Sequence, residues 1–297
     1  MTASQQRAAA DYLSEAYRVS QRRASAVLGR SRSTIRYRRR DRSAALPLVK
    51  AMVRLARKHP RWGYRMIHAL LVRAGWQVNL KRVHRLWREL SLQRPVRRRK
   101  PHKLGPKRGT STNSCVNRPA RFKGDVWTYD FIADRTVCGG ALKWLTLVDE
   151  YTRECLALHV GRQVSGADVR RVLARVVGRR GAPRLVRSDN GSEFIGEALS
   201  RWLPEKGARP IPVAPGSPWE NGYIESFNSR FRDEFLEVEE FESVPDAKEK
   251  KEWFRREYNT VRPHSSLDYK TPKQFSDECD RGLHGQPPKS EAEILDP

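Results

Sequence analysis

Three acidic residues stand where a carboxylate could do chemistry. Asp130 lies within an apolar run at 126–133 that is predicted to be a strand, and a carboxylate there costs stability unless it is paired or bound to a cation. Asp189 ends a second short strand at 184–188, and acids at the carboxyl end of a strand point into the cleft of an α/β sheet. Glu225 follows 36 positions later in a predicted helix. These acids are the candidates for a chemical site.

The elements around the acids predict an α/β fold. Strands are expected at 126–133, 143–149, 155–160, 184–188 and 208–213, and helices at 169–177, 194–203, 223–235 and 244–258. Three strands in a meander, followed by alternating helix and strand, predict a mixed sheet flanked by helices. The helix that carries Glu225 has two possible starts. Ser217, Pro218 and Glu220 form a capping-box pattern, whereas Asn221 could cap a helix that begins one turn later.

Charge divides the chain into two parts. The 297 residues carry 59 Lys and Arg against 34 Asp and Glu, and this net charge of +25 favours a polyanionic partner, by default nucleic acid. Residues 1–120 hold 31 Lys and Arg and four acids, a net charge of +27. Residues 121–297 hold 28 Lys and Arg and 30 acids, a net charge of −2. The asymmetry indicates DNA binding in the first part and a different role in the second. A solubility or ribosome-associated excess of charge is the alternative reading.

Composition excludes several classes of protein. Four cysteines are scattered at Cys115, Cys138, Cys155 and Cys279. Without a C-x-x-C pair they indicate neither a disulfide framework nor a Cys-rich zinc site, and they fit a reducing cytosol. His59, His68 and His84 likewise lack the paired cysteines of a zinc site. No apolar window of 18 residues and no secretory signal is read, so we expect a cytoplasmic protein without membrane contact.

The basic part reads as two helical units. Residues 20–40 predict two short helices around Gly29, a helix-turn-helix pattern. Residues 46–92 predict three further helices of the same kind. The candidate DNA contacts in the two units are Arg32, Arg36, Arg38, Arg39, Lys81, Arg82 and Arg85. A generic basic helical hairpin is the alternative for the first unit.

A basic linker follows these units. Residues 93–120 lose hydrophobic periodicity and mix Pro and Gly with cations, which favours a strap along phosphates over a merely solvated linker. Its candidate DNA contacts are Arg97, Arg98, Arg99 and Lys100. The expected segments are therefore 1–45 and 46–92 (DNA-binding units), 93–120 (linker), 121–240 (catalytic domain) and 241–297 (C-terminal helix and tail).

Four segments resemble the DDE transposase/integrase superfamily, and most closely the larger product (OrfB) of the IS-three family of bacterial insertion sequences. They are WTYDF at 127–131, RSDNGSEF at 187–194, SPWENGYIESFN at 217–228 and YNTVRPHSSL at 258–267. The resemblance runs from about residue 15 to 275. The 35 residues between Asp189 and Glu225, together with the tail at 258–267, make it specific.

The resemblance implies a ribonuclease H-like fold in which Asp130, Asp189 and Glu225 are catalytic metal ligands. Three carboxylates in one cleft repel one another and need divalent cations between them. Two Mg²⁺ ions, for which Mn²⁺ can substitute, would assist in-line displacement at phosphate. The implied activity is transposition: strand cleavage and strand transfer at the terminal inverted repeats of an insertion sequence. The implied partners are double-stranded DNA, further copies of the chain in a dimer or higher multimer, and a smaller upstream product (OrfA).

Several other residues are ambiguous at this level. Arg232 lies two helical turns after Glu225 and resembles a contact to transposon-end DNA, with an ion pair to a neighbouring acid as the alternative. Asp149 reads as a structural acid in a hairpin, and Glu193 as a stabiliser of a helix start. Arg262 and His264 could contact DNA or fix the tail.

Two other functions compete with transposition. The basic units alone would suit a DNA-binding regulator with an inert nuclease-like half, which the intact set of three acids argues against. A ribonuclease H-like nuclease on RNA–DNA hybrids is the other, and the two helix-turn-helix-like units argue for duplex DNA instead.

Overall fold

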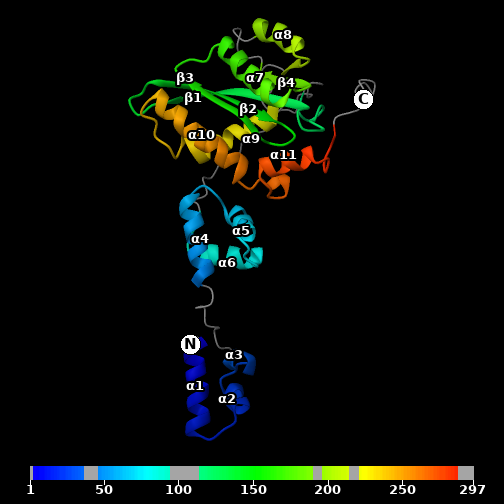
Figure 1. Ribbon diagram of the computed structural model, residues 1–297. Helices are drawn as coiled ribbons and strands as arrows, with labels where there is room; N and C mark the ends of the chain where they lie inside the picture. The colour runs from blue at the N-terminus through cyan, green and yellow to red at the C-terminus, as the bar shows by residue number, and fades with distance from the viewer. Residues whose placement is uncertain (1–2, 37–45, 94–113, 190–195, 214–220, 287–297) are drawn as a thin grey trace, which may run out of the picture. The chain divides into compact units, whose positions relative to one another are not determined.

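The computed structural model describes residues 3–36, 46–93, 114–189, 196–213 and 221–286 (Figure 1). The chain divides into two compact units, Met1–Arg54 and Leu55–Pro297, and the boundary falls within the sequence of helix α4 (Leu46–Lys58). Expected residues Arg38, Arg39 and 97–100 lie outside the described ranges, as do the loop at 214–220 and Glu193. Within the described ranges, no helix has both the length and the apolar character that a membrane span requires.

The first unit begins with three helices around a small core. They are α1 (Ala3–Ala16), α2 (Gln21–Val27) and α3 (Arg32–Arg36). Ala10, Ala24 and Ile35, one from each helix, are buried together. The predicted pair α2 and α3 is present, and Gly29 between them has a φ of +64°, the left-handed conformation that glycine adopts without strain. Helix α1 was not expected from the sequence.

The second unit starts with the remaining helices of the basic part. After the end of α4 come α5 (Tyr64–Arg73) and α6 (Leu80–Glu89), so the three predicted helices are present. Asn79 caps α6, because its side chain accepts a hydrogen bond of 2.8 Å from the Lys81 amide. Ile67, Leu71, Val83, Leu86 and Trp87 are buried, whereas Lys81, Arg82 and Arg85 are exposed.

A five-stranded mixed sheet organises the rest of this unit. Its strands are β1 (Val126–Arg135), β2 (Ala141–Asp149), β3 (Cys155–Gly161), β4 (Leu185–Asp189) and β5 (Arg209–Val213). The order is β3-β2-β1-β4-β5, with antiparallel pairing among the first three and parallel pairing of β1 with β4 and of β4 with β5. Pro210 and Pro212 lack amide donors and fall on the edge strand, where they are tolerated. The expected fold, a ribonuclease H-like mixed sheet, is confirmed.

Helices cover both faces of the sheet (Figure 1). Helices α7 (Gly166–Arg180) and α8 (Gly196–Glu205) pack on one face, over side chains such as Trp127 and Leu145. Helices α9 (Gly222–Phe231) and α10 (Val244–Thr260) pack on the other, over Ile132 and Trp144. Because both faces are buried, the central strands read as nearly continuous apolar runs, and this is why Asp130 stands out in the sequence.

The predicted helix at 223–235 changes its winding. Helix α9 ends at Phe231, and a π-helical turn, η3 (Arg232–Leu236), completes it. Phe231 and Phe235 both pack against Trp144, with ring centroids 5.3 and 6.0 Å from it. Beyond α10 the tail forms a 3-10 turn, η4 (Ser265–Leu267), and a further helix, α11 (Pro272–Asp280), which was not expected.

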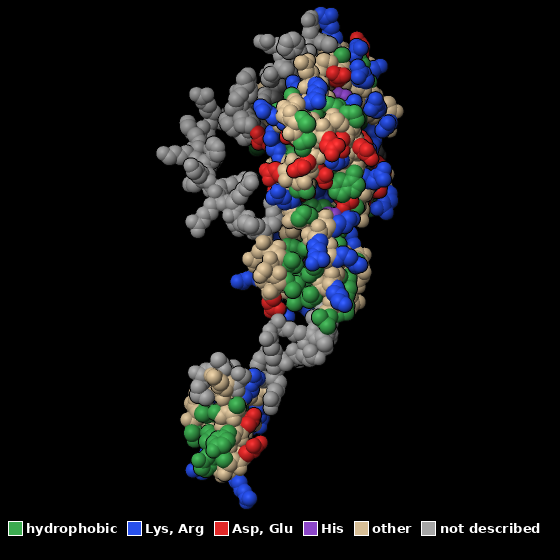
Figure 2. Space-filling view, turned by 90° about the vertical axis from the view of Figure 1, so that its left-hand side faces the viewer, with side chains coloured by type: hydrophobic (Ala, Val, Ile, Leu, Met, Phe, Trp, Pro, Cys, Tyr) green, Lys and Arg blue, Asp and Glu red, His purple; other side chains and the backbone are tan. Residues whose placement is uncertain are grey.

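Figure 2 shows acidic and basic side chains interspersed over one face of the sheet-containing part. This mixture agrees with the net charge of −2 on residues 121–297. The positive excess of the chain is therefore carried by its first 120 residues, where the helical units and the linker lie.

Truncation of the aromatic core should unfold the sheet region. Trp144 is fully buried among Phe231, Phe235 and Phe241, so Trp144→Ala should lower the free energy of unfolding by about 3–5 kcal/mol in urea titrations of the full chain. Trp253→Ala is the control, because that ring is 53% exposed and its loss should cost under about 0.5 kcal/mol. Equal losses in the two variants would contradict this description of the core.

Candidate active site

Asp130 is anchored from two directions. Its Oδ2 atom accepts a hydrogen bond of 2.8 Å from the side-chain amide of Asn228 on α9. Its Oδ1 atom accepts one of 2.7 Å from the backbone amide of Phe131. Thr146, opposite Asp130 on β2, places its hydroxyl 2.9 Å from Asn228 Oδ1 and 3.2 Å from the Asp130 carbonyl oxygen. The carboxylate is therefore held in one orientation by the backbone of its own strand and by helix α9, and Thr146 on the neighbouring strand holds Asn228 in place.

A second hydrogen bond fixes the start of the same helix. Thr128, two residues before Asp130 on β1, donates to Asn221 Oδ1 at 2.6 Å, and both side chains are buried. Helix α9 is described from Gly222, with Asn221 at its N-cap position, and the alternative start at Ser217–Glu220 lies outside the described ranges. The Asn221 side chain bonds to β1 and does not cap the helix. Asn221 and Asn228 lie two turns apart on one face, so together they set the rotation of α9 over β1.

Glu225 lies between these two anchors. It is four residues after Asn221 and three before Asn228, and positions with these spacings share one side of a helix. Its side chain is exposed, whereas Ile224 and Phe227 beside it enter the apolar core. The helix thus buries its apolar positions and presents a carboxylate beside the strand that carries Asp130.

Strand register places Asp189 next to Asp130. Tyr129 pairs with Ser188 in the parallel ladder of β1 and β4, so one further step along both strands reaches Asp130 and Asp189. Side chains alternate along a strand, and Val186 faces α7 and α8. Asp189 therefore occupies a register position on the α9 face. The structure describes its backbone as the last residue of β4.

Carboxylates make up the described part of this site. Asp130 and Glu225 supply oxygen donors, which suit a hard cation such as Mg²⁺. In the ranges where side chains are described, no group of three His, Cys, Asp or Glu residues is close enough to hold a metal ion. The side chain of Asp189, the third acid expected from the sequence, lies outside those ranges.

A buried ion pair supports β4. Arg187, two residues before Asp189, pairs with Glu150, and both side chains are fully buried. Arg187 also donates to the Arg118 carbonyl oxygen at 2.8 Å. Burial raises the pKa of Glu150 to about 7, and the charge of Arg187 opposes that shift. Because an unpaired buried charge is costly, the pair restrains the strand that carries Asp189.

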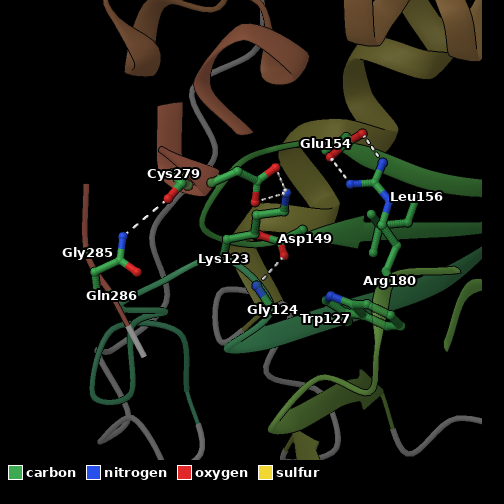
Figure 3. A pocket seen from close by; sticks show the side chains of 11 residues that line it. Lys123, Gly124, Trp127, Asp149, Glu154, Leu156, Arg180, Cys279, Gly285 and Gln286 are labelled. Atoms are coloured by element: carbon green, nitrogen blue, oxygen red, sulfur yellow. Dashed lines mark hydrogen bonds and ion pairs between the residues drawn. The ribbon is translucent and has the colours of Figure 1, made fainter. Parts of the chain in front are cut away.

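A pocket near the other end of β1 is a separate feature (Figure 3). Its volume is about 320 Å³, and Gly124, Asp149 and Arg180 line it. It borders the residues that precede β1, whereas Asp189 is at the carboxyl end of β4, the end where α/β sheets bind ligands. Asp149 accepts backbone hydrogen bonds from Gly124, Tyr151 and Thr152 at 2.8–2.9 Å. It is a structural acid, as the sequence indicated.

The tail residues turn inward. Arg262 is 4% exposed and forms two hydrogen bonds to Glu234, at 2.7 and 2.5 Å. His264 lies 3.1 Å from the Tyr258 hydroxyl and 3.1 Å from the Ser266 hydroxyl. Of the two readings left open by the sequence, these contacts support fixing the tail.

Arg232 is exposed beside this arrangement. The acids that follow it pair elsewhere: Asp233 with Arg61 at 3.5 Å, and Glu234 with Arg262. The alternative in which Arg232 is occupied by a neighbouring acid therefore has no support among the described ion pairs. Arg32 is exposed in the same way, and Arg36 donates to Gln21 at 2.7 Å.

Two residues of the site were missed by the sequence reasoning. Asn228 falls three positions after Glu225 and seven after Asn221, and this helical spacing was the available signal. Thr146 offered none, because its role depends on the pairing of β2 with β1.

Family models match most of the chain. Two models described as integrase core domain match residues 121–218 and 206–272, and one described as an HTH-like domain matches residues 43–100. The first two together span every strand of the sheet and both helices of the α9 face.

Relatives from bacteria match along most of their length. An insertion element IS476 protein of 39.2 kDa from Xanthomonas euvesicatoria is 38% identical over 258 residues, covering 87% of this chain and 72% of the relative. An insertion element IS407 protein of 31.7 kDa from Burkholderia multivorans is 36% identical over 262 residues, which cover 88% of this chain and 92% of the relative. Transposase InsD of insertion element IS2D from Escherichia coli is 28% identical, with coverage of 73% of each chain.

Loss of the Asn228 amide should weaken cation binding at Asp130. Asn228→Ala removes the donor that orients Oδ2, and loss of such a partner typically costs about 10–100-fold in metal affinity. Titration with Mn²⁺, followed by electron paramagnetic resonance, measures this affinity. Ser229→Ala is the control at the adjacent exposed position. Unchanged affinity in a folded Asn228→Ala variant would show that the amide does not support a cation site.

Burial of His264 should make stability depend on pH. Desolvation, with Arg262, Arg230 and Arg153 nearby, lowers the pKa of His264 from 6.5 to about 3. The unfolded chain therefore binds the proton more readily, and stability should fall as pH falls below 6.5, by up to about 1.4 kcal/mol per pH unit from this group. Urea titrations from pH 7 to 5 should show a shallower loss in His264→Gln. Parallel losses in the two proteins would refute this effect.

Proposed function

Because this chain belongs to the integrase-core transposases of bacterial insertion elements, we propose that Asp130, Asp189 and Glu225 form its catalytic site. The chain is a transposase, and its function is DNA transposition. The proposal concerns the residues and the ions that carry out the reaction. The observation behind it is the Asp130 carboxylate, anchored within a buried sheet and bonded to the helix that presents Glu225.

The donor set fits divalent cations. The proposed ions are two Mg²⁺, with Mn²⁺ as a substitute, held by oxygen atoms of the three acids. A carboxylate has acceptor positions for about four donors or cations, so the bond from Asn228 orients Asp130 without exhausting its capacity. When bound, such ions would supply the positive charge that an in-line displacement at phosphate requires. Without it, three acids on one face would repel one another.

Protein groups set the geometry of this reaction. Asp130 is fixed by Asn228 and Thr146, and Glu225 by the two anchors of α9. The proposed substrate is the phosphodiester at a terminal inverted repeat. Water attacks it in strand cleavage, and the freed 3′-hydroxyl attacks a target phosphate in strand transfer. Cleavage breaks the bond between phosphorus and the 3′-oxygen, which leaves a 3′-hydroxyl and a 5′-phosphate. In strand transfer the freed 3′-oxygen bonds to the target phosphorus, and the 3′-oxygen of the target strand leaves as a hydroxyl.

The basic part would hold the DNA. Exposed cations at Lys81, Arg82 and Arg85 on α6, and at Arg32 and Arg36 on α3, suit phosphate and groove contacts. The proposal includes Arg38, Arg39 and residues 97–100, which lie outside the described ranges, and exposed Arg232 near the catalytic helix.

The proposal extends to assembly and location. Joining two ends of one element requires both ends to be bridged, so we propose a dimer or higher multimer on duplex DNA, with a smaller upstream OrfA product as a candidate partner. The substrate DNA of a bacterial element places the reaction in the cytoplasm, at the nucleoid.

Conservative changes at the three acids should separate catalysis from binding. Asp130→Asn, Asp189→Asn and Glu225→Gln each remove a charge at nearly constant shape, so cleavage and strand transfer of a labelled end with Mg²⁺ should be abolished while binding to that end persists. Glu205→Gln, at an exposed acid on α8, is the control and should retain activity. Near-normal activity in any of the three variants would overturn its assignment.

Variants of the basic part should impair DNA binding instead of catalysis. Arg82→Ala and Arg85→Ala should each weaken end binding, most strongly at low salt, and should make the affinity less dependent on salt, because each removes a phosphate-binding charge. A wild-type chain that binds ends but cleaves none with Mg²⁺ or Mn²⁺ would favour a regulator, and preference for an RNA–DNA hybrid would favour a ribonuclease.

A further inference from the structure

The tail at 258–267 contains buried polar groups that the proposed reaction does not use. Asn259 bonds to both backbone groups of Cys155 at the start of β3, at 2.9 and 2.8 Å, and so fixes the end of α10 to the sheet. Three residues later Arg262 is buried against Glu234 of the π-helical turn η3. A fully satisfied pair at this position restrains the turn that follows the catalytic helix.

Glu234 has a second partner from a distant part of the chain. Its Oε2 atom accepts hydrogen bonds from Arg262 Nε at 2.7 Å and from Trp62 Nε1 at 3.0 Å. Trp62, in the turn before α5, is 4% exposed and stacks on His59 with ring centroids 3.8 Å apart and planes 6° apart. Burial lowers the pKa of His59 to about 4, so a neutral imidazole lies against the indole at physiological pH.

Further contacts surround this bond. Arg61 lies 3.5 Å from Asp233 and 3.6 Å from Glu237, on either side of Glu234. Lys58 and His59 each lie 3.6 Å from Glu257 on α10. The turn before α5 therefore meets η3 and α10 with the cations Arg61 and Lys58 opposite acids, and with the neutral His59 beside a buried aromatic ring.

The other end of α5 meets the same tail. Arg73, in its last turn, donates to the carbonyl oxygen of Val261 at 3.0 Å and to that of Tyr269. The two ends of α5 thus contact the sheet region at different places, the turn before it at Glu234 and its last turn at Val261, next to Arg262. Contacts at two separated points restrain rotation as well as position, which a single contact would not.

We propose that the Glu234–Arg262 pair is a docking site for the indole of Trp62, through which the tail holds the α5–α6 segment (residues 58–89) on the sheet region. The docked segment carries the cations of α6, so docking sets the distance between the proposed DNA contacts and the catalytic acids. This consequence for DNA rests on the proposed function, whereas the docking itself does not.

The chemistry of the site accounts for its composition. Glu234 needs a charged partner because it is nearly buried, with 8% of its side chain exposed, and Arg262 supplies one. A second acceptor position on Oε2 then receives the indole N–H, which a buried tryptophan must satisfy. Phenylalanine at position 62 would fill the volume and leave that acceptor unpaired.

Distance measurements between two spin labels test docking without DNA or metal. Labels at Val72→Cys on α5 and Lys248→Cys on α10 occupy exposed positions, and Cys115→Ser with Cys138→Ser removes the accessible native thiols. We expect a narrow distance distribution in the otherwise wild-type chain. Trp62→Phe and Glu234→Gln should each broaden it, and Glu249→Gln, at an exposed acid of α10, should not. A thermal melt verifies that each variant is folded.

The two possible failures are distinguishable. A broad distribution in the wild-type chain, or a narrow one in both folded variants, overturns the docking site whatever the enzyme does. If docking is confirmed, strand transfer in Trp62→Phe at saturating end DNA should fall by about 10–100-fold while end affinity stays within about twofold, since misplacement of bound groups has costs of this size. Undiminished transfer in an undocked variant would reject the positioning role.

Discussion

Two buried asparagines on α9 hold the site together. Asn221 accepts from Thr128 and Asn228 donates to Asp130, so the helix is bonded at both ends of its inner face to the central strand. The aromatic cluster around Trp144 supplies apolar burial, which is large but non-directional. Buried polar groups must find specific partners, so these bonds decide which rotation of α9 is acceptable. The position of Glu225 follows from that rotation.

Buried ion pairs recur beside the elements that carry the acids. Arg187 with Glu150 supports β4, and Arg262 with Glu234 supports the turn that extends α9. Such pairs add little net stability, because the desolvation of both charges opposes their attraction. Breaking one leaves a charge buried alone, however, and this makes alternative arrangements of the chain expensive. Residues 121–297 have a net charge near zero, but they contain opposite charges that are paired and buried beside the elements that carry the acids.

The sequence predicted those features that depend on local patterns. The strands could be read because apolar runs are local signals. The three acids, which stand out by their places on these elements, stay a prediction, and the sequence offered two starts for α9 without choosing between them. Helix α11 was missed although Thr271 and Gln274 form a capping box, since Pro272 at its first position resembled part of a Pro-rich tail. The partners of the polar groups could not be read. Arg262 and Glu234 are 28 residues apart, and Thr146 and Asn228 are 82 apart, so only the fold brings them together.

The central claim is that Asp130, Asp189 and Glu225 surround one divalent-cation site. Iron-directed cleavage tests it in the full chain, because Fe²⁺ bound in place of Mg²⁺ generates hydroxyl radicals that cut the nearest backbone. Mass spectrometry of the fragments should locate cuts in three separate segments, around residues 130, 189 and 225, and excess Mg²⁺ should suppress all three together. Cuts confined to other segments, or cuts that persist with excess Mg²⁺, would contradict the account.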